Sequence, residues 1–205
     1  MPANPAETLL SPENHSLLMI DHQYLQMLTI RSHDTNDLIN HAVALAEAAA
    51  IFKVPMLTTT AFKERQGLVA PLAEATKAVK PIDRTTLNSW EDPRIVDWVE
   101  STGRKKLVIA GQWTEVCAAM PVLSVLDAGY DVYVVTDACG GASSKRMTWR
   151  WNAWCRQAHT RSLPGPMCPN CSATGHVQPP PNRSPNCSHR EAAPSDRACC
   201  GSGTC

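Results

Sequence analysis

The sequence has little aromatic content, no surplus of either charge and no long apolar run. Phe, Trp and Tyr together make up 5% of the chain, and 19 basic side chains balance 19 acidic ones. This balance gives no electrostatic reason to expect a nucleic acid or an anionic membrane as a partner. No apolar stretch approaches the roughly 20 residues that a membrane-spanning helix needs. We therefore expect neither nucleic-acid binding nor membrane insertion.

The N-terminal stretch also lacks the pattern of a secretion signal. The stretch MPANPAETLLSPENH has no basic start followed by an apolar core. This absence predicts a cytoplasmic, reducing location, in which structural disulfides are rare.

The region after Trp154 lacks aromatic side chains altogether. It holds half of the 16 prolines, and seven of the nine cysteines follow residue 150. Its sizeable aliphatic side chains are Leu163, Met167 and Val177. Such a segment cannot bury enough apolar surface to offset the entropy lost on ordering. We expect residues from about 156 to 205 to be disordered, with the change of character beginning near Ser143.

Before that point, short apolar runs alternate with helical patterns. The predicted strands are Ser16–Ile20, Val54–Thr60, Ile82–Arg84, Leu107–Ala110 and Asp131–Thr136. The predicted helices are Asp37–Phe52, Leu68–Val79, Pro93–Thr102 and Glu115–Ala128. Strict alternation indicates an α/β fold with a parallel sheet and helices on both faces. In such sheets, sites form beyond the carboxyl ends of the strands.

The stretch KLVIAGQWTEVCAAMPVLSV, residues 106–125, has the strand–turn–helix pattern that can position a nucleophile. An apolar strand ends at Gly111, Thr114 can cap a helix, and Cys117 falls in its first turn. Unpaired backbone N–H groups at a helix start favour the thiolate, which is the nucleophilic form. The alternative is a buried structural cysteine, which is common.

Two further polar residues follow predicted strands. Asp21 directly follows an apolar run, so its carboxylate can accept the proton of a nearby thiol; alternatively it caps a loop. Arg84 can keep Asp21 ionised or orient a substrate carbonyl; alternatively it is a surface arginine. With Cys117, these residues form a candidate catalytic cluster.

Four segments carry a family resemblance: LLMIDHQ, IDRTTLNSWEDP, AGQWTEVC and GYDVYVVTDACGG. In this order and spacing they resemble the isochorismatase-like cysteine hydrolases, and most closely the YcaC-related amidohydrolase branch. The resemblance covers roughly residues 10 to 143. It implies a three-layer, Rossmann-like α/β fold, truncated here after the fifth strand. The implied domains are residues 1–143, an incomplete hydrolase domain, and residues 144–205, a Pro/Cys-rich tail.

The resemblance also implies roles for individual residues. Cys117 matches the nucleophile and Asp21 the general base, while Arg84 stands where the superfamily usually has lysine. A cis peptide would join Gln112 and Trp113, and the N–H groups of Trp113 and Cys117 would form an oxyanion hole. Side chains expected to support the site or line the pocket are His22, Gln23, Phe62, Asn88 and Trp90.

No metal or other cofactor is expected at this site. Some relatives bind a metal through an Asp-x-His motif, and no such motif stands near Asp21. The expected partner is a small-molecule substrate with a C–N bond, and an intact family member is expected to form a homo-oligomer.

The tail has the composition of a sequence read in another frame. Back-translation of residues 147–155, which are rich in the single-codon residues Met and Trp, permits an amphipathic helix in the shifted frame. That helix, and a strand start after it, would continue the family pattern. A zinc knuckle is the alternative reading of Cys168, Cys171 and His176, but its fourth position is Pro181.

Three functions therefore remain open at this stage. The leading one is a cysteine hydrolase that acts on a small amide. The second is an inactive domain with a binding or interaction role, in which the tail holds a metal or a partner. The third is a non-functional product with an exposed edge on its fifth strand.

The frame hypothesis predicts the nucleotide sequence. Reading the gene in the shifted frame from about codon 142 should give a helix, a sixth strand and a tryptophan-containing segment. Resequencing of the gene checks this, and an early stop codon in that frame would contradict it.

Overall fold

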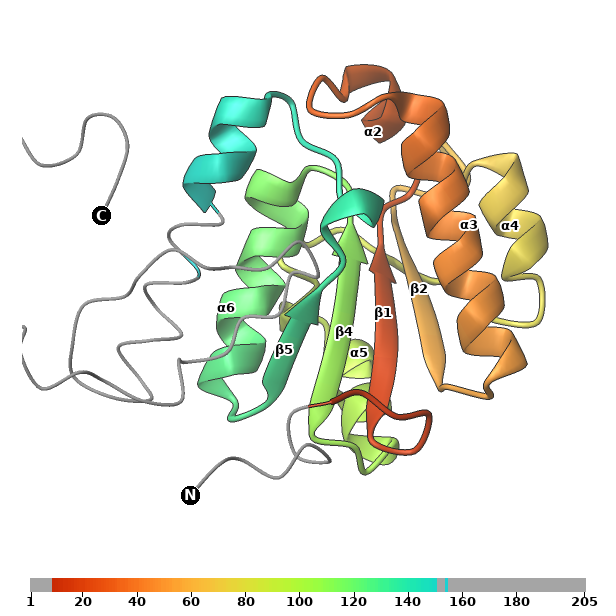
Figure 1. Cartoon of the computed structure of the whole chain (residues 1–205), viewed down its shortest axis with the longest axis vertical. Coiled ribbons are helices and arrows are strands. Elements are labelled where there is room, and N and C mark those ends of the chain that lie inside the picture. The colour runs from red at the N-terminus through yellow and green to blue at the C-terminus, as the bar shows by residue number, and fades with distance from the viewer. Residues whose placement is uncertain (1–8, 151–153, 155–205) are drawn as a thin grey trace, which may run out of the picture.

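Five parallel strands form one sheet in the order β3-β2-β1-β4-β5 (Figure 1). The computed structural model describes residues 9–150 and residue 154. Its strands are β1 (His15–Ile20), β2 (Met56–Ala61), β3 (Ile82–Arg84), β4 (Lys106–Gly111) and β5 (Asp131–Val134). The central pair, β1 and β4, is almost entirely buried, which explains why both strands read as continuous apolar runs.

Helices cover both faces of the sheet. They are α2 (Tyr24–Thr29), α3 (Thr35–Ile51), α4 (Ala70–Ala75), α5 (Pro93–Ser101) and α6 (Ala119–Asp127). Three short turns complete the order: the 3₁₀ turns η1 (Ser89–Glu91) and η3 (Thr136–Ala138), and the π turn η2 (Thr114–Ala118). Helix α3 packs with α4, whereas α5 and α6 both contact η1 (Figure 1). The first pair and the second pair therefore lie on opposite faces.

The direction in which successive strands are added to the sheet reverses between β1 and β4. From β1 the chain winds outward to β2 and β3, and it then crosses back to β4 and β5. Ile20 pairs with Gly111 at the carboxyl ends of these two strands. This point, where crossovers leave in opposite directions, is the usual binding crevice of an open α/β sheet.

Most predicted elements are confirmed. Strand β3 has the predicted bounds, and α5 begins at Pro93 with the Asp92 carboxylate accepting from the Arg94 N–H at 3.0 Å. Helix α2 was not predicted from the sequence, and the predicted helix Glu115–Ala128 is a π turn followed by α6. Thr114 was predicted to cap this segment, and this is wrong: the N-cap position falls one residue earlier, at Trp113, and no side-chain cap hydrogen bond forms.

The described fold continues past the predicted boundary at residue 143. Residues 144–150 are helical, and Met147 and Trp154 belong to the hydrophobic core. The predicted disorder, the predicted sixth strand and the cysteines at 168, 171 and beyond all lie outside the described residues. Within the described part, β5 is the edge of the sheet, with Val132 and Val134 buried.

Replacing Trp154 with alanine tests whether the segment after residue 143 is part of the domain. Because Trp154 is 0% exposed, Trp154→Ala should lower the free energy of unfolding by about 3–5 kcal/mol. Trp149 is 65% exposed, so Trp149→Ala is the matched control, with an expected change within about 0.5 kcal/mol. Urea unfolding measures both, and equal effects would contradict the packing of this segment into the core.

Candidate active site

Asp21, Arg84 and Cys117 meet at the carboxyl edge of the sheet. Asp21 follows β1, Arg84 ends β3, and Cys117 lies in η2 after β4. The three side chains are buried, and Cys117 is only 3% exposed. The sequence predicted all three as one cluster, and the fold brings them together because the strands that carry them are parallel.

Asp21, the acid of this cluster, forms a buried ion pair with Arg84. One guanidinium nitrogen of Arg84 donates to Asp21 Oδ2 at 2.5 Å, and another donates to the Thr86 carbonyl oxygen. Thr59 Oγ1 donates to Asp21 Oδ1 at 3.4 Å. The alternative of a surface arginine is therefore wrong. Thr59 was missed in the sequence, although three consecutive threonines at the end of a buried strand are an unusual signal.

Burial controls the protonation of the acid and the thiol. Burial raises the pKa of Asp21, and the Arg84 charge opposes that shift without cancelling it. Burial also raises the pKa of the Cys117 thiol to about 12, and the nearby Asp21 charge adds to this effect. Cys117 is therefore a thiol at neutral pH. The prediction of a thiolate favoured by its helix position is wrong, because desolvation outweighs the field of one short turn.

The thiol lies within hydrogen-bonding reach of the acid, as the mutual effect of Cys117 and Asp21 on their pKa values indicates. A buried thiol needs a base in contact with it if it is to attack as a thiolate. Asp21 can act in this way, and Arg84 can balance the charge as the proton moves.

The turn before Cys117 differs from the family expectation. None of the described peptide bonds is cis, so the expected cis bond between Gln112 and Trp113 is wrong. Trp113 instead takes a left-handed conformation, φ 55° and ψ 61°, which turns the chain into η2. The Cys117 N–H donates to the Trp113 carbonyl at 2.9 Å, so in this structure it is engaged within the turn rather than free for an oxyanion.

The other predicted pocket residues have different surroundings. The Gln23 amide bonds to backbone groups of Ala61 and Gln66, and His22 Nε2 donates to the Ala138 carbonyl beyond β5. The Asn88 amide donates to Ser124 Oγ on α6. These three side chains support the framework of the site. Phe62 is more exposed than they are, and its N–H donates to the Arg84 carbonyl.

Trp90 packs against the residue that precedes β5. Its ring lies edge-on to Tyr130, with centroids 5.9 Å apart, and Tyr130 stands just before the start of β5. This contact joins segments that are 40 residues apart, so sequence spacing alone could not reveal it.

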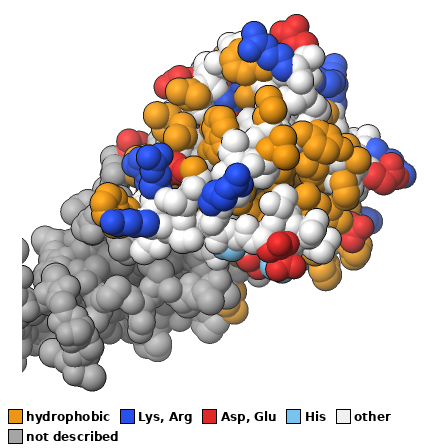
Figure 2. All heavy atoms as spheres, turned by 90° about the horizontal axis from the view of Figure 1, so that it is seen from above, with side chains coloured by type: hydrophobic (Ala, Val, Ile, Leu, Met, Phe, Trp, Pro, Cys, Tyr) orange, Lys and Arg blue, Asp and Glu red, His pale blue; other side chains and the backbone are white. Residues whose placement is uncertain are grey.

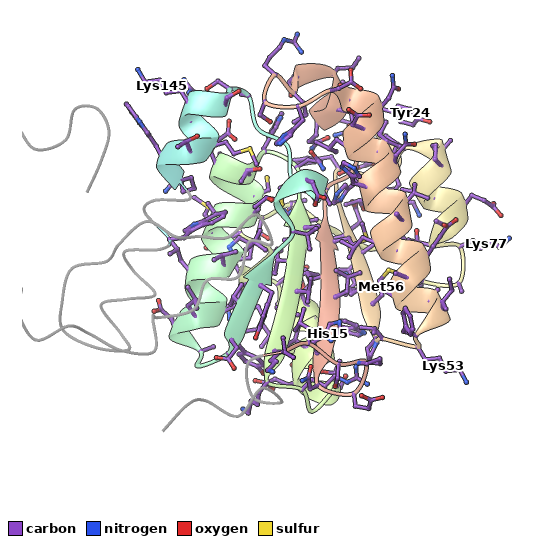
Figure 3. All side chains as sticks on the ribbon, viewed as in Figure 1. His15, Tyr24, Lys53, Met56, Lys77 and Lys145 are labelled. Atoms are coloured by element: carbon purple, nitrogen blue, oxygen red, sulfur yellow. The ribbon has the colours of Figure 1, made fainter. Side chains whose placement is uncertain are left out.

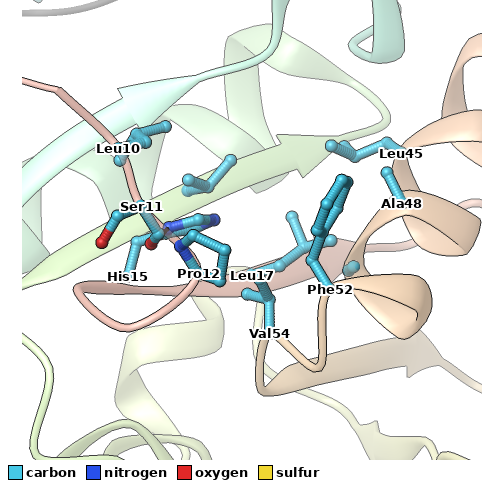
Figure 4. A pocket seen from close by; sticks show the side chains of 11 residues that line it. Leu10, Ser11, Pro12, His15, Leu17, Leu45, Ala48, Phe52 and Val54 are labelled. Atoms are coloured by element: carbon cyan, nitrogen blue, oxygen red, sulfur yellow. Dashed lines mark hydrogen bonds between the residues drawn. The ribbon is translucent and has the colours of Figure 1, made fainter.

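A strongly apolar pocket lies away from the cluster. It has a volume of about 280 Å³, and Leu10, Pro12, His15, Phe52 and Val54 are among the residues that line it (Figure 4). His15 begins β1, whereas Tyr24 follows its far end, and Figure 3 shows the two at opposite edges. A second pocket, of about 250 Å³, is lined by Trp113, Glu115 and Val116 of the turn that carries Cys117.

The surface around the carboxyl edge carries apolar side chains. Figure 2 looks onto this edge and shows apolar side chains spread over much of it. Helix α2, next to Asp21, buries Gln26 and Met27 and exposes Tyr24, Leu25 and Leu28. The helix therefore presents three large, largely apolar side chains on its outward side.

Neither a metal cluster nor a membrane helix is found in the part described. Among residues 9–150 and 154, no three His, Cys, Asp or Glu side chains gather closely enough to hold a metal ion. Over the same residues, no helix combines the length and apolarity needed to cross a bilayer.

The sheet order and the Cys–Asp–Arg cluster define an α/β protein with the isochorismatase fold. The family model for the isochorismatase domain matches residues 15–154, and the chain belongs to this family. The match extends past residue 143, where the resemblance in the sequence was expected to stop.

The relatives identify the branch as that of YcaC. The probable hydrolase YcaC of Escherichia coli is 38% identical over 136 residues, which cover 64% of this chain and 64% of that protein. The chain thus matches less than two-thirds of that relative. YcaC from Pseudomonas aeruginosa, solved with hexane-2,5-diol and covalent acrylamide, has a TM-score of 0.67 and 35% identity, covering 70% of this chain and 72% of that one. The E. coli YcaC structure, described as an octameric hydrolase of unknown specificity, has a TM-score of 0.67, 33% identity and the same coverage.

Removal of the arginine tests the buried ion pair. Arg84→Met leaves Asp21 as a buried, unpaired acid and should lower the free energy of unfolding by about 3–5 kcal/mol at neutral pH. The pKa of Asp21 is already raised in the folded state, and loss of Arg84 raises it further. The destabilisation should therefore be small below the ordinary pKa of aspartate and grow as pH rises through the raised value.

Arg94→Met is the matched control, because Arg94 pairs with Asp92 at 2.5 Å while its own side chain is 59% exposed. This substitution should cost about 0–1 kcal/mol with little pH dependence. Urea unfolding at several pH values measures both variants. A pH-independent loss in Arg84→Met would contradict the assignment of the effect to Asp21.

Proposed function

We propose that this chain is a cysteine hydrolase that cleaves the C–N bond of a small amide-like substrate through an acyl-enzyme. The observation that carries the proposal is the convergence of Cys117 with the Asp21–Arg84 ion pair at the carboxyl edge of the sheet. Membership of the isochorismatase family and similarity to YcaC, a probable hydrolase, support it.

In the first step, Asp21 accepts the proton of the Cys117 thiol as the sulfur attacks the substrate carbonyl carbon. The raised pKa of Asp21 brings it closer to that of the thiol, so the transfer is less uphill than to an exposed carboxylate. The C–N bond then breaks, and the leaving nitrogen takes the proton back from Asp21. Arg84 stabilises Asp21 whenever it is ionised.

In the second step, a water molecule attacks the thioester. Asp21 again accepts a proton, now from water, and returns it to the Cys117 sulfur as the acid is released. The Trp113 N–H is proposed as a donor to the oxyanion of both tetrahedral intermediates. The Cys117 N–H can join it only if the η2 turn opens its bond to the Trp113 carbonyl.

The substrate is proposed to be small. Cys117 is nearly covered, and a pocket of only about 250 Å³ is lined by Trp113, Glu115 and Val116, its neighbours in sequence. P. aeruginosa YcaC was solved with covalent acrylamide, which is itself a small amide. Acrylamide is therefore a suitable first probe of this chain.

We also propose that the chain works as a homo-oligomer in the cytoplasm. E. coli YcaC is described as octameric, and the outward apolar side of α2 is a surface that a neighbouring subunit can cover. The predicted alternative of a binding protein depends on the tail, which lies outside the described residues.

Replacement of the nucleophile tests the hydrolase assignment. Cys117→Ser should reduce ammonia release from acetamide, acrylamide and benzamide by about 10⁴-fold or more, since it removes the nucleophile. Cys139→Ser is the matched control, because Cys139 is an equally buried thiol whose pKa is also raised to about 12 by burial. It should retain most of the activity. Equal losses in the two variants, or hydrolysis that survives Cys117→Ser, would contradict the proposal.

A further inference from the structure

One residue of the cluster, Asp21, and one beside it, Trp113, have strained backbone conformations. Asp21 has φ 56° and Trp113 has φ 55°, both in the left-handed region that non-glycine residues rarely adopt. They follow β1 and β4, which are neighbours in the sheet. Such strain persists only where the surrounding structure over-determines it, and it gathers at functional sites.

The neighbour of each strained residue binds the same backbone carbonyl. His22 follows Asp21 and Gln112 precedes Trp113, and both are 0% exposed. His22 Nε2 lies 3.0 Å from the Ala138 oxygen, and Gln112 Nε2 lies 3.2 Å from it. Ala138 ends η3, beyond β5, and lies 116 residues from His22 in sequence. One carbonyl therefore joins the turns that carry the acid and the nucleophile.

The segment after Ala138 also holds the nucleophile turn. The Thr114 N–H donates to the Gly140 carbonyl at 2.9 Å, and Gln112 forms a parallel bridge with Gly140. A Cβ atom at residue 140 would lie 2.6 Å from Gln112 Oε1, so any larger residue there would displace this amide. The Gln112 N–H donates to the Ile20 carbonyl at 3.0 Å, directly before Asp21. The contacts of Gln112 with Gly140 on one side and with Ile20 on the other therefore restrict its position.

The protonation of His22 suits a hydrogen bond donated from Nε2. Burial lowers the pKa of His22 to about 4, so the ring is neutral at neutral pH. A carbonyl oxygen can only accept, so the ring proton is on Nε2. Both side chains then donate to the two lone pairs of one oxygen.

We propose that His22 and Gln112 are positioning residues, which fix the distance between Asp21 and Cys117 through their shared acceptor, the Ala138 carbonyl. This inference rests on the proposed function, because it assigns to that function two side chains that touch neither the thiol nor the acid. Loss of either donor leaves one strained turn free to relax, and small misplacements of reacting groups cost rate steeply.

The test measures the alkylation of Cys117 by iodoacetamide between pH 5 and 10. The full chain is used, and peptide mass spectrometry reports the modification of Cys117 separately from the other cysteines. Asp21 and Arg84 are the charged groups that face this thiol. In the unmodified chain, general-base help from Asp21 should make the rate level off once Asp21 is ionised.

Gln112→Met and His22→Phe keep the volume of the side chain and remove its donor. Each should slow alkylation of Cys117 at pH 7 about tenfold, with a rate that now rises steadily with pH as thiolate forms. The double variant should lose less than the product of the two single losses, since both donors act through one carbonyl. Circular dichroism checks that the variants fold.

Gln26→Met is the matched control, because Gln26 is also a buried glutamine and its Oε1 has no hydrogen-bond partner. It should alkylate like the unmodified chain. Unchanged rates and profiles in folded Gln112→Met and His22→Phe would overturn the inference. Unfolding of both variants would also overturn it, since the two side chains would then serve the fold and not the site.

Asp21→Asn separates this inference from the proposed function. If Asp21→Asn alkylates as fast as the unmodified chain, the acid does not assist the thiol and the proposed function fails. If Asp21→Asn is slow while both positioning variants are normal, the function stands and the positioning role fails. Slow alkylation in Asp21→Asn, Gln112→Met and His22→Phe supports both the proposed function and the positioning role.

Discussion

The buried Asp21–Arg84 ion pair is the interaction on which the candidate site depends. It links the end of β1 to the end of β3, which are separated by β2 in the sheet. A carboxylate without this partner would be too costly to bury, and the thiol beside it would lose its base. Arginine is suited to this place because its guanidinium remains charged when buried and binds Asp21 and the Thr86 carbonyl at once. The superfamily's usual lysine would offer a single charged nitrogen there.

The balance between desolvation and charge decides how Cys117 can react. A helix start was expected to stabilise the thiolate, yet burial raises the pKa of the thiol to about 12. The turn is a short π turn, and its N–H at Cys117 is already bonded to Trp113. In the proposed mechanism, the cysteine stays protonated until a substrate is present, and proton transfer to Asp21 is then coupled to attack. A buried, protonated thiol is also less open to oxidation, since oxidation follows thiolate character and exposure.

The segment that follows β5, at the edge of the described sheet, also supports the candidate site. Its segment Thr136–Gly140 provides the carbonyl that both His22 and Gln112 contact, and Gly140 also binds the turn that carries Cys117. The geometry of the site therefore depends on the strand at the edge of the described sheet. Trp154 and Met147 extend the core beyond this strand, so the described domain does not stop where the four family segments end. The Ala138 carbonyl thus joins the end of β5 to His22 and Gln112, the neighbours of the two strained residues.

The sequence by itself determined the alternation of strands and helices, the bounds of β3 and the start of α5, because apolar runs, proline and capping residues act locally. It also indicated Asp21, Arg84 and Cys117, since each stands at or just after the end of a strand in a parallel sheet. Only the tertiary structure decided the raised pKa of the thiol, the trans bond and left-handed turn at Trp113, and the packing of Trp90 against Tyr130. These features depend on burial and on contacts between distant segments, such as His22 with Ala138. No local pattern of residues records such contacts, because they arise only when the strands are assembled side by side.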